Sequence, residues 1–128
     1  MLAKGTPIHG EFTSADASAL SEANSRLALY GAGSTTSLTL GSTDYVALTD
    51  LVISVGAALT VTIYSGADAT VDAGEQMAKL TFAAAGVQSV RLDTPGWTLI
   101  GTYPKVKTSG AGTVTVFATG VATSIAPN

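Results

Sequence analysis

The chain has 128 residues, of which 46% are hydrophobic and only 12% are charged, and its formal net charge is −3 at pH 7. A chain of this length and apolar content can bury one hydrophobic core, so we expect a single domain. The absence of cysteine excludes disulfides, thiolate zinc sites and cysteine nucleophiles. The six Lys and Arg residues are scattered along the sequence, so nucleic acid is not an expected partner.

The first segment, residues 1–13, contains Pro7 and Gly10 and shows little periodicity. This pattern is typical of an extended arm, and we predict that the segment is free or pairs with a strand outside the domain. No apolar stretch follows Lys4, so we expect no secretory signal peptide and synthesis in a cytoplasm.

Two interpretations of residues 14–30 stay open, a short helix and a continuation of the extended arm. Apolar side chains fall at helical spacing, a capping sequence precedes them and Gly31 follows them. The residues of this stripe are Leu20, Ala23, Leu27 and Tyr30. The Gly-Ala-Gly-Ser sequence at 31–34 is a candidate joint. We therefore predict an arm over 1–33 and a β-sandwich domain over 34–128.

From residue 37 onward the sequence contains short runs rich in Val, Ile, Leu and Thr, separated by Gly, Asp, Pro and Ser. The predicted strands are 37–40, 45–48, 51–55, 59–64, 76–83, 87–92, 97–103, 104–108 and 113–119. Alternation places Ala78, Leu80 and Phe82 on one face. In the last strand it likewise places Val114, Val116 and Ala118 toward the core.

Turn signals divide these strands. Pro95-Gly96 predicts a type II turn, and Ser109–Gly112 predicts a hairpin between the last two strands. About eight short strands at this spacing are typical of a sandwich, a jelly roll or a small barrel. We predict an all-β fold, an antiparallel β-sandwich that is jelly-roll-like.

The longest uncharged stretch, residues 51–67, is nearly long enough to span a bilayer. Gly56 interrupts it, and apolar residues alternate with threonine from Leu59 onward. This pattern favours two strands joined by a turn over a membrane segment, and no membrane partner is expected.

Candidate chemical groups are few. The single histidine, His9, lies in the predicted arm, so a Ser-His-Asp triad would require the arm to fold back over the sandwich. Asp68, Asp72 and Glu75 share one loop and could offer oxygen ligands to calcium, but their spacing matches no EF-hand. We therefore predict no enzyme activity, no cofactor and no metal, with this acidic loop as the calcium alternative.

The aromatic and basic residues near the C-terminus also have two interpretations. Trp97, Tyr103 and Tyr64 could form a platform for a sugar ring, but we favour Trp97 as a core anchor. Lys105 and Lys107 flank Val106 on one face of a strand, and we predict a solvated edge there.

The combination of an arm, a Gly-Ala-Gly-Ser joint and a neutral Thr/Ala/Gly-rich sandwich ends in 92–97 (LDTPGW), 103–107 (YPKVK) and 112–116 (GTVTV). In overall style, across most of its length, the chain resembles the small decoration, or cement, proteins of tailed-bacteriophage capsids. The resemblance implies a virion structural protein that binds the assembled head, usually as a homotrimer, and bridges neighbouring major capsid subunits.

For that role we predict contacts to the major capsid protein through the arm, with further aromatic contacts from the sandwich, on the capsid exterior. The arm residues are Lys4, Pro7, Ile8, His9 and Phe12, and the aromatic residues are Trp97 and Tyr103. Two alternatives stay open, a carbohydrate-binding β-sandwich module and a structural component of a phage tail or baseplate.

Overall fold

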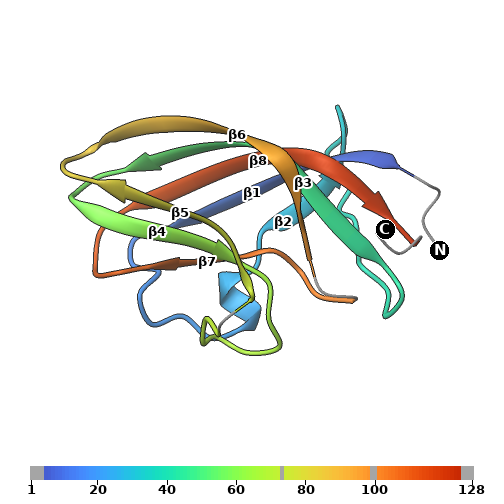
Figure 1. Cartoon of the computed structure of the whole chain (residues 1–128), viewed down its shortest axis with the longest axis horizontal. Helices are drawn as coiled ribbons and strands as arrows, with labels where there is room; N and C mark the ends of the chain where they lie inside the picture. Colours follow the sequence, from blue (N-terminus) through green and yellow to red (C-terminus); the bar gives the residue numbers. More distant parts are fainter. Residues whose placement is uncertain (1–4, 73, 99–100, 125–128) are drawn as a thin grey trace.

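The computed structural model describes residues 5–72, 74–98 and 101–124, with the side chains of 93–97 outside the description. The described residues form eight strands and one 3-10 helix, η1 (Figure 1). Their bounds are β1 Thr6–Ser14, η1 Ala23–Ser25, β2 Ala28–Gly31, β3 Tyr45–Val55, β4 Leu59–Tyr64, β5 Gln76–Phe82, β6 Gly86–Trp97, β7 Lys105–Thr108 and β8 Val114–Thr123. Among the described residues, no helix has the length and apolar character needed to cross a bilayer.

The strands form two antiparallel sheets that pack face to face, which confirms the predicted all-β sandwich (Figure 1). The large sheet has the order β2-β1-β8-β3-β6, and the small sheet has the order β5-β4-β7. The run β1-β8-β3-β6 follows jelly-roll order, in which β2 would lie beside β7 in the opposite sheet. Here a single bridge, between Arg26 and Lys105, joins that part of the chain to β7, and β2 pairs with β1 instead.

Alternation of apolar and polar side chains produces the core between the sheets. Leu59, Val61 and Ile63 of β4 are buried, and the threonines between them are half-buried. On β5, Leu80 and Phe82 are buried and their neighbours are exposed, as predicted from the sequence. The inward residues of β8, Val114, Val116 and Ala118, also follow the prediction.

Several predicted strand boundaries were wrong. Residues 45–55 form one strand, β3, because a bulge absorbs Thr49 instead of ending the strand. Pro95 and Gly96 lie within β6, where an irregularity places four residues of β6, 92–95, opposite Thr49 of β3, so they do not separate two strands as predicted. Residues 37–40 contribute one bridge, from Ser37 to Tyr30, and no strand.

The predicted hairpin between the last two strands was also wrong. β7 belongs to the small sheet and β8 to the large sheet, so residues 109–113 cross from one layer to the other. By contrast, the stretch 51–67 contains the end of β3 and all of β4, which confirms two strands joined by a turn.

The predicted N-terminal arm over 1–33 is the largest correction. From Thr6, β1 runs between β8 and β2 and pairs with β8 over its whole length, Thr6–Ser14. Ile8 and Phe12 point into the core, with 2% and 6% of their surface exposed. These residues are therefore part of the sandwich, because their apolar side chains fill the core between the sheets.

The predicted helix and joint are corrected in the same way. Only Ala23–Ser25 is helical, as one 3-10 turn, and β2 begins three residues later. Leu27 and Leu29 are both buried, a spacing of two that belongs to extended chain rather than to an α-helix. Residues 31–34 form a tight turn, closed by a hydrogen bond that the Ser34 amide donates to the Gly31 carbonyl.

Candidate binding surface

The outer face of the large sheet carries three stacked rings. The His9 ring lies between those of Tyr30 and Phe117, with centroid distances of 5.2 Å and 5.6 Å. The His9 Nε2 atom lies 3.3 Å from a carboxylate oxygen of Glu11. Strand pairing brings these rings together, because His9 and Tyr30 are direct cross-strand partners on β1 and β2.

Beside this stack the outer face exposes apolar surface. Phe117 and Val52 are cross-strand partners on β8 and β3, and each has 42% of its surface exposed. We call Val52, Phe117, His9 and Tyr30 the outer-face patch. An open depression of about 410 Å³, lined in part by Pro7 and His9, borders it.

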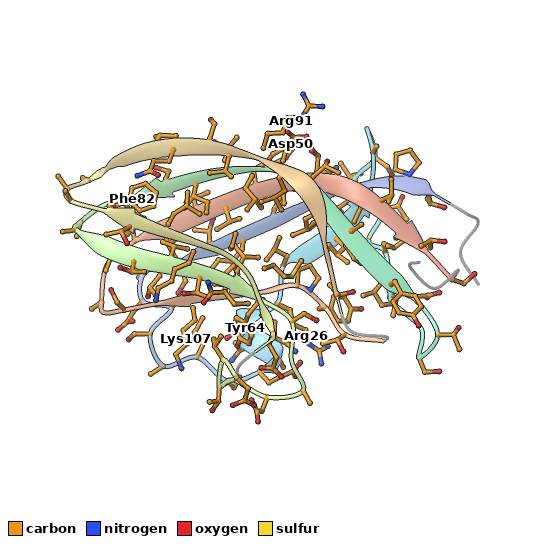
Figure 2. The ribbon with its side chains drawn as sticks, in the orientation of Figure 1. Arg26, Asp50, Tyr64, Phe82, Arg91 and Lys107 are labelled. Carbon is orange, nitrogen blue, oxygen red and sulfur yellow. The ribbon has the colours of Figure 1, made fainter. Side chains whose placement is uncertain are left out.

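Most outward residues around the outer-face patch are uncharged, but Glu11 is the cross-strand partner of Phe117, and Asp50 pairs with Arg91 across β3 and β6. Thr119 is the cross-strand partner of both His9 and Asp50. In Figure 2, Asp50 and Arg91 lie on the outer side of the large sheet, away from the labelled Tyr64 and Arg26. The threonine, valine and aromatic side chains of this face lose little hydration when they are covered.

The predicted arm contacts therefore divide between two environments. Pro7 and His9 lie on the outer face, exposed and half-buried respectively, where a partner can reach them. Ile8 and Phe12 are buried in the core, so their assignment as partner contacts was wrong. Lys4 lies outside the described residues.

The predicted aromatic platform is not assembled among the described side chains. Tyr64 is fully buried and cannot face a ligand. The Tyr103 hydroxyl accepts a hydrogen bond from the Leu40 amide at 3.0 Å, and the Arg26 guanidinium lies 4.8 Å from the centre of its ring. The Trp97 side chain lies outside the description.

The acidic loop forms local hydrogen bonds. The Thr70 amide donates to Asp68 Oδ1, and the Asp72 amide donates to Glu75 Oε1, each at 2.9 Å. Within the described ranges no three His, Cys, Asp or Glu side chains come close enough to hold a metal ion. The loop therefore gives no support to the calcium alternative.

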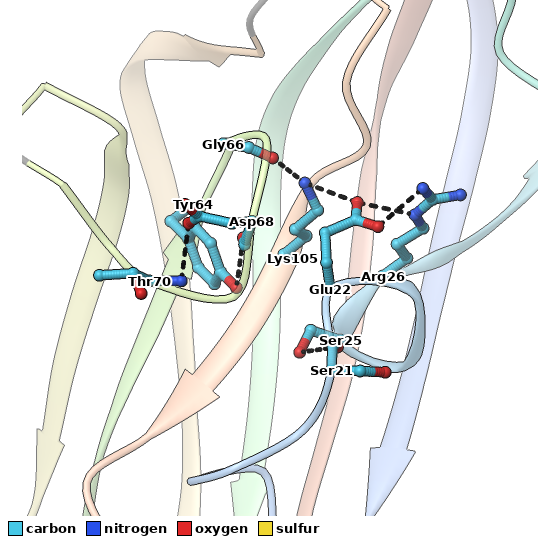
Figure 3. Close-up of polar contacts among 9 residues, drawn as sticks. All are labelled: Ser21, Glu22, Ser25, Arg26, Tyr64, Gly66, Asp68, Thr70 and Lys105. Carbon is cyan, nitrogen blue, oxygen red and sulfur yellow. Dashed lines mark hydrogen bonds and ion pairs between the residues drawn. The ribbon is translucent and has the colours of Figure 1, made fainter.

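An ion-pair cluster on the small sheet escaped the sequence analysis (Figure 3). Lys105 is fully buried, so its assignment to a solvated edge was wrong. Its Nζ lies 2.9 Å from Glu22 Oε1 and donates a hydrogen bond to the Gly66 carbonyl. Arg26 binds the same carboxylate through two nitrogens, at 2.9 Å and 3.0 Å.

This cluster fastens two loops to β7. Lys105 pairs with Tyr64 across β7 and β4, and both side chains point away from the core between the sheets. The β1–β2 connection, which carries Glu22, and the β4–β5 loop, which carries Gly66, bond to Lys105 on that side (Figure 3). Strand alternation indicates which side of a sheet a residue faces but not which loop covers that side, so this burial could not be predicted from the sequence.

Electrostatics within the cluster are consistent with its geometry. Hydrogen bonds from Arg26 hold the pKa of Glu22 below its ordinary value, and the neighbouring Lys105 acts in the same direction. Burial raises the pKa of Tyr64, whose hydroxyl lies 3.5 Å from the Asp68 carbonyl. The cluster has its charges satisfied internally, which suits a structural fastening rather than a reactive site.

Comparison with known proteins yields no match for this chain among family models, curated proteins or solved structures.

Proposed function

We propose that this chain is a virion structural protein, a decoration protein that binds the assembled head of a tailed phage and bridges neighbouring major capsid subunits. The proposal places the contact on the outer-face patch. This surface replaces the N-terminal arm as the contact, since the arm residues belong to the sandwich.

The observation that supports the proposal is the exposed pair Val52 and Phe117 on the outer face of the large sheet. A soluble monomer usually covers its exterior with charge, whereas only 12% of this chain is charged. A charge-poor face with half-exposed aromatic and branched side chains costs little to desolvate against a protein lattice. Jelly rolls serve both in viral shells and in lectins, so the fold leaves this choice open, and the chemistry of the outer-face patch supports the first of the two.

The stacked rings favour a protein partner over a sugar. A sugar ring binds against the exposed face of an aromatic ring. Both faces of the His9 ring are covered by Tyr30 and Phe117, with interplanar angles of 24° and 20°. His9 therefore has no free ring face for a sugar, and Val52 beside Phe117 offers methyl groups, which suit contact with another protein surface.

The test is co-sedimentation of the purified chain with shells assembled from the major capsid protein encoded in the same genome. The wild-type chain should pellet with the shells to saturation at a fixed number of copies per capsid subunit. The double variant Val52→Thr with Phe117→Ser should weaken binding about tenfold or more, because it removes both central apolar contacts. Both replacements introduce small polar residues that an exposed strand position accepts.

A matched control is Thr81→Ser on the exposed face of the small sheet, which should bind as the wild type does. Equal binding by the double variant would remove the outer-face patch from the proposal. No binding by the wild type, or no major capsid gene in the genome, would remove the proposed function itself.

A further inference from the structure

The two sheets have four outer edges, and the chain itself covers two of them. Beside β2, the Leu38 amide donates to the Leu29 carbonyl at 2.8 Å. Beside β7, the Leu27 amide donates to Pro104 and the Thr108 amide donates to Ala17. These edges are closed to other strands because their backbone groups already have partners.

The third edge, β5, is protected by its side chains. Lys79 stands exposed near the middle of this strand, and a charged lysine on an edge opposes pairing with another chain. The Gln88 side chain also donates to the Thr81 carbonyl at 3.2 Å.

The fourth edge, β6, lacks such protection in its first half. In the part of the chain that the structure describes, no segment pairs with the outer edge of β6 (Figure 1). Residues 86–89 are exposed, and Val87 is 64% exposed. The sequence from Gly86 to Val90 contains no charge and no proline. An open, neutral strand of this kind accepts another strand through backbone hydrogen bonds.

We propose that the occupant is a second copy of this chain, paired antiparallel through the β6 edges about a two-fold axis at Ser89. In this register no two like charges face each other. Arg91, the one charged residue between Gly86 and Leu92, would face Val87 of the partner copy instead of the partner's Arg91. Like charges are thereby kept apart, as an isologous contact requires.

This pairing would bring the outer-face patches of both copies onto one surface. Ser89 is the cross-strand partner of Val52, which is the partner of Phe117. A two-fold axis at Ser89 continues this row from one copy into the other. The two large sheets become one, and any lattice that binds the outer-face patch meets two patches at once.

The experiment is light scattering of the full-length chain over about 10 to 500 µM, because an edge contact is small and should be weak. The expected mass approaches twice the 12.7 kDa of one chain at high concentration and returns to one chain on dilution. A mass of one chain throughout, or of three chains as the resemblance implies, would overturn the pairing.

Charge variants test the register. Ser89→Lys places two like charges opposite each other and should weaken dimerisation about five- to tenfold. Val87→Glu places a carboxylate opposite the partner's Arg91 twice per dimer and should tighten it about three- to tenfold. Adding Arg91→Glu to Val87→Glu should reverse that gain.

The control Thr81→Lys adds the same charge on the β5 edge and should leave the mass unchanged. A Ser89→Lys effect without a Val87→Glu effect of opposite sign would overturn this register. The mass measurement contains no shells, and the shell-binding variant Val52→Thr with Phe117→Ser leaves the β6 residues unchanged. The pairing and the proposed function can therefore fail independently.

Discussion

Lys105 places an ammonium group at a fully buried position, where the loss of hydration costs several kcal/mol. The Glu22 carboxylate at 2.9 Å and the Gly66 carbonyl replace the lost water. Glu22 also binds Arg26, and its side chain is 27% exposed, so it would stay hydrated and paired without Lys105. Lys105 therefore depends on Glu22 more than Glu22 depends on Lys105.

This asymmetry predicts different costs for the two truncations. Glu22→Ala leaves the buried Lys105 without its counter-ion and should lower the free energy of unfolding by about 2 to 4 kcal/mol. Lys105→Met keeps the volume, removes the buried charge and should cost less than about 1.5 kcal/mol. Urea unfolding measures both, with Glu11→Ala on the exposed face as the control. A larger cost for Lys105→Met than for Glu22→Ala would contradict this account.

The same carboxylate predicts a pH dependence. Because the pKa of Glu22 is lowered on folding, its stabilising contribution is complete above its ordinary value of 4.5 and is lost as the pH falls through the lower, folded value. The wild type should therefore lose more stability on acidification below about pH 5 than Glu22→Gln does. Urea titrations of both chains between pH 3 and 7 measure the difference. Parallel curves would show that Glu22 does not contribute.

At the scale of single elements, the sequence predicted those strands whose alternation is regular and uninterrupted. β4 was predicted with its bounds Leu59–Tyr64, and the buried faces of β5 and β8 were correct. β1 was missed although Ile8 and Phe12 alternate with polar residues, because Gly10 lies between them at an inward position. A Cβ at Gly10 would lie 2.9 Å from a Leu27 methyl group, so a larger side chain would collide with Leu27 at this position.

Helical spacing misled the prediction over residues 14–30. Leu20, Ala23 and Leu27 do fall on one helical stripe, but the chain here must cross from β1 past β7 before it returns to β2. Tertiary contacts, such as the hydrogen bond from the Leu27 amide to Pro104, override a weak local preference. Such contacts join residues that are distant in sequence, so periodicity within one segment cannot predict them.

The bulge in β3 predicts a strict requirement at Gly120. A Cβ at this position would clash with the Ala47 carbonyl oxygen, next to the bulge in the paired strand β3. Gly120→Ala should cost about 3 kcal/mol, since only backbone movement relieves the clash. Gly110→Ala is the matched control, because nothing lies within 4 Å of its Cβ position. Thermal unfolding compares the two, and equal costs would show that the bulge adapts freely.

For the molecule as a whole, strand order is the property that the sequence could not provide. β1 and β8 stand at opposite ends of the chain and yet pair over nine residues, Thr6–Ser14 with Val114–Ala122. Nothing local distinguishes a strand that will pair so far away from an arm that will pair with another molecule. The same limit applies to the outer-face patch. His9 was predicted as a contact from the sequence, but only the register of strand pairing shows that Phe117 and Val52 lie on the same face.

This topology predicts that removal of residues 2–13 abolishes folding. The deletion removes nearly all of β1, separates β2 from β8 and takes Ile8 and Phe12 out of the core. Losing two large buried side chains costs roughly 5 to 8 kcal/mol, which is comparable to the whole stability of a domain this size. Circular dichroism and amide NMR dispersion should therefore show an unfolded or collapsed chain.

Two further measurements connect this result to β1 itself. In the full chain, Phe12→Ala should cost about 3 to 4 kcal/mol, whereas Thr13→Ala on the exposed face should cost under about 0.5 kcal/mol. A peptide of residues 1–14 added to the deleted chain should restore amide dispersion, because it can re-enter the gap between β8 and β2 by strand addition. A deleted chain that unfolds cooperatively at the wild-type temperature would instead show that residues 2–13 are an arm, and would return the capsid contact to them.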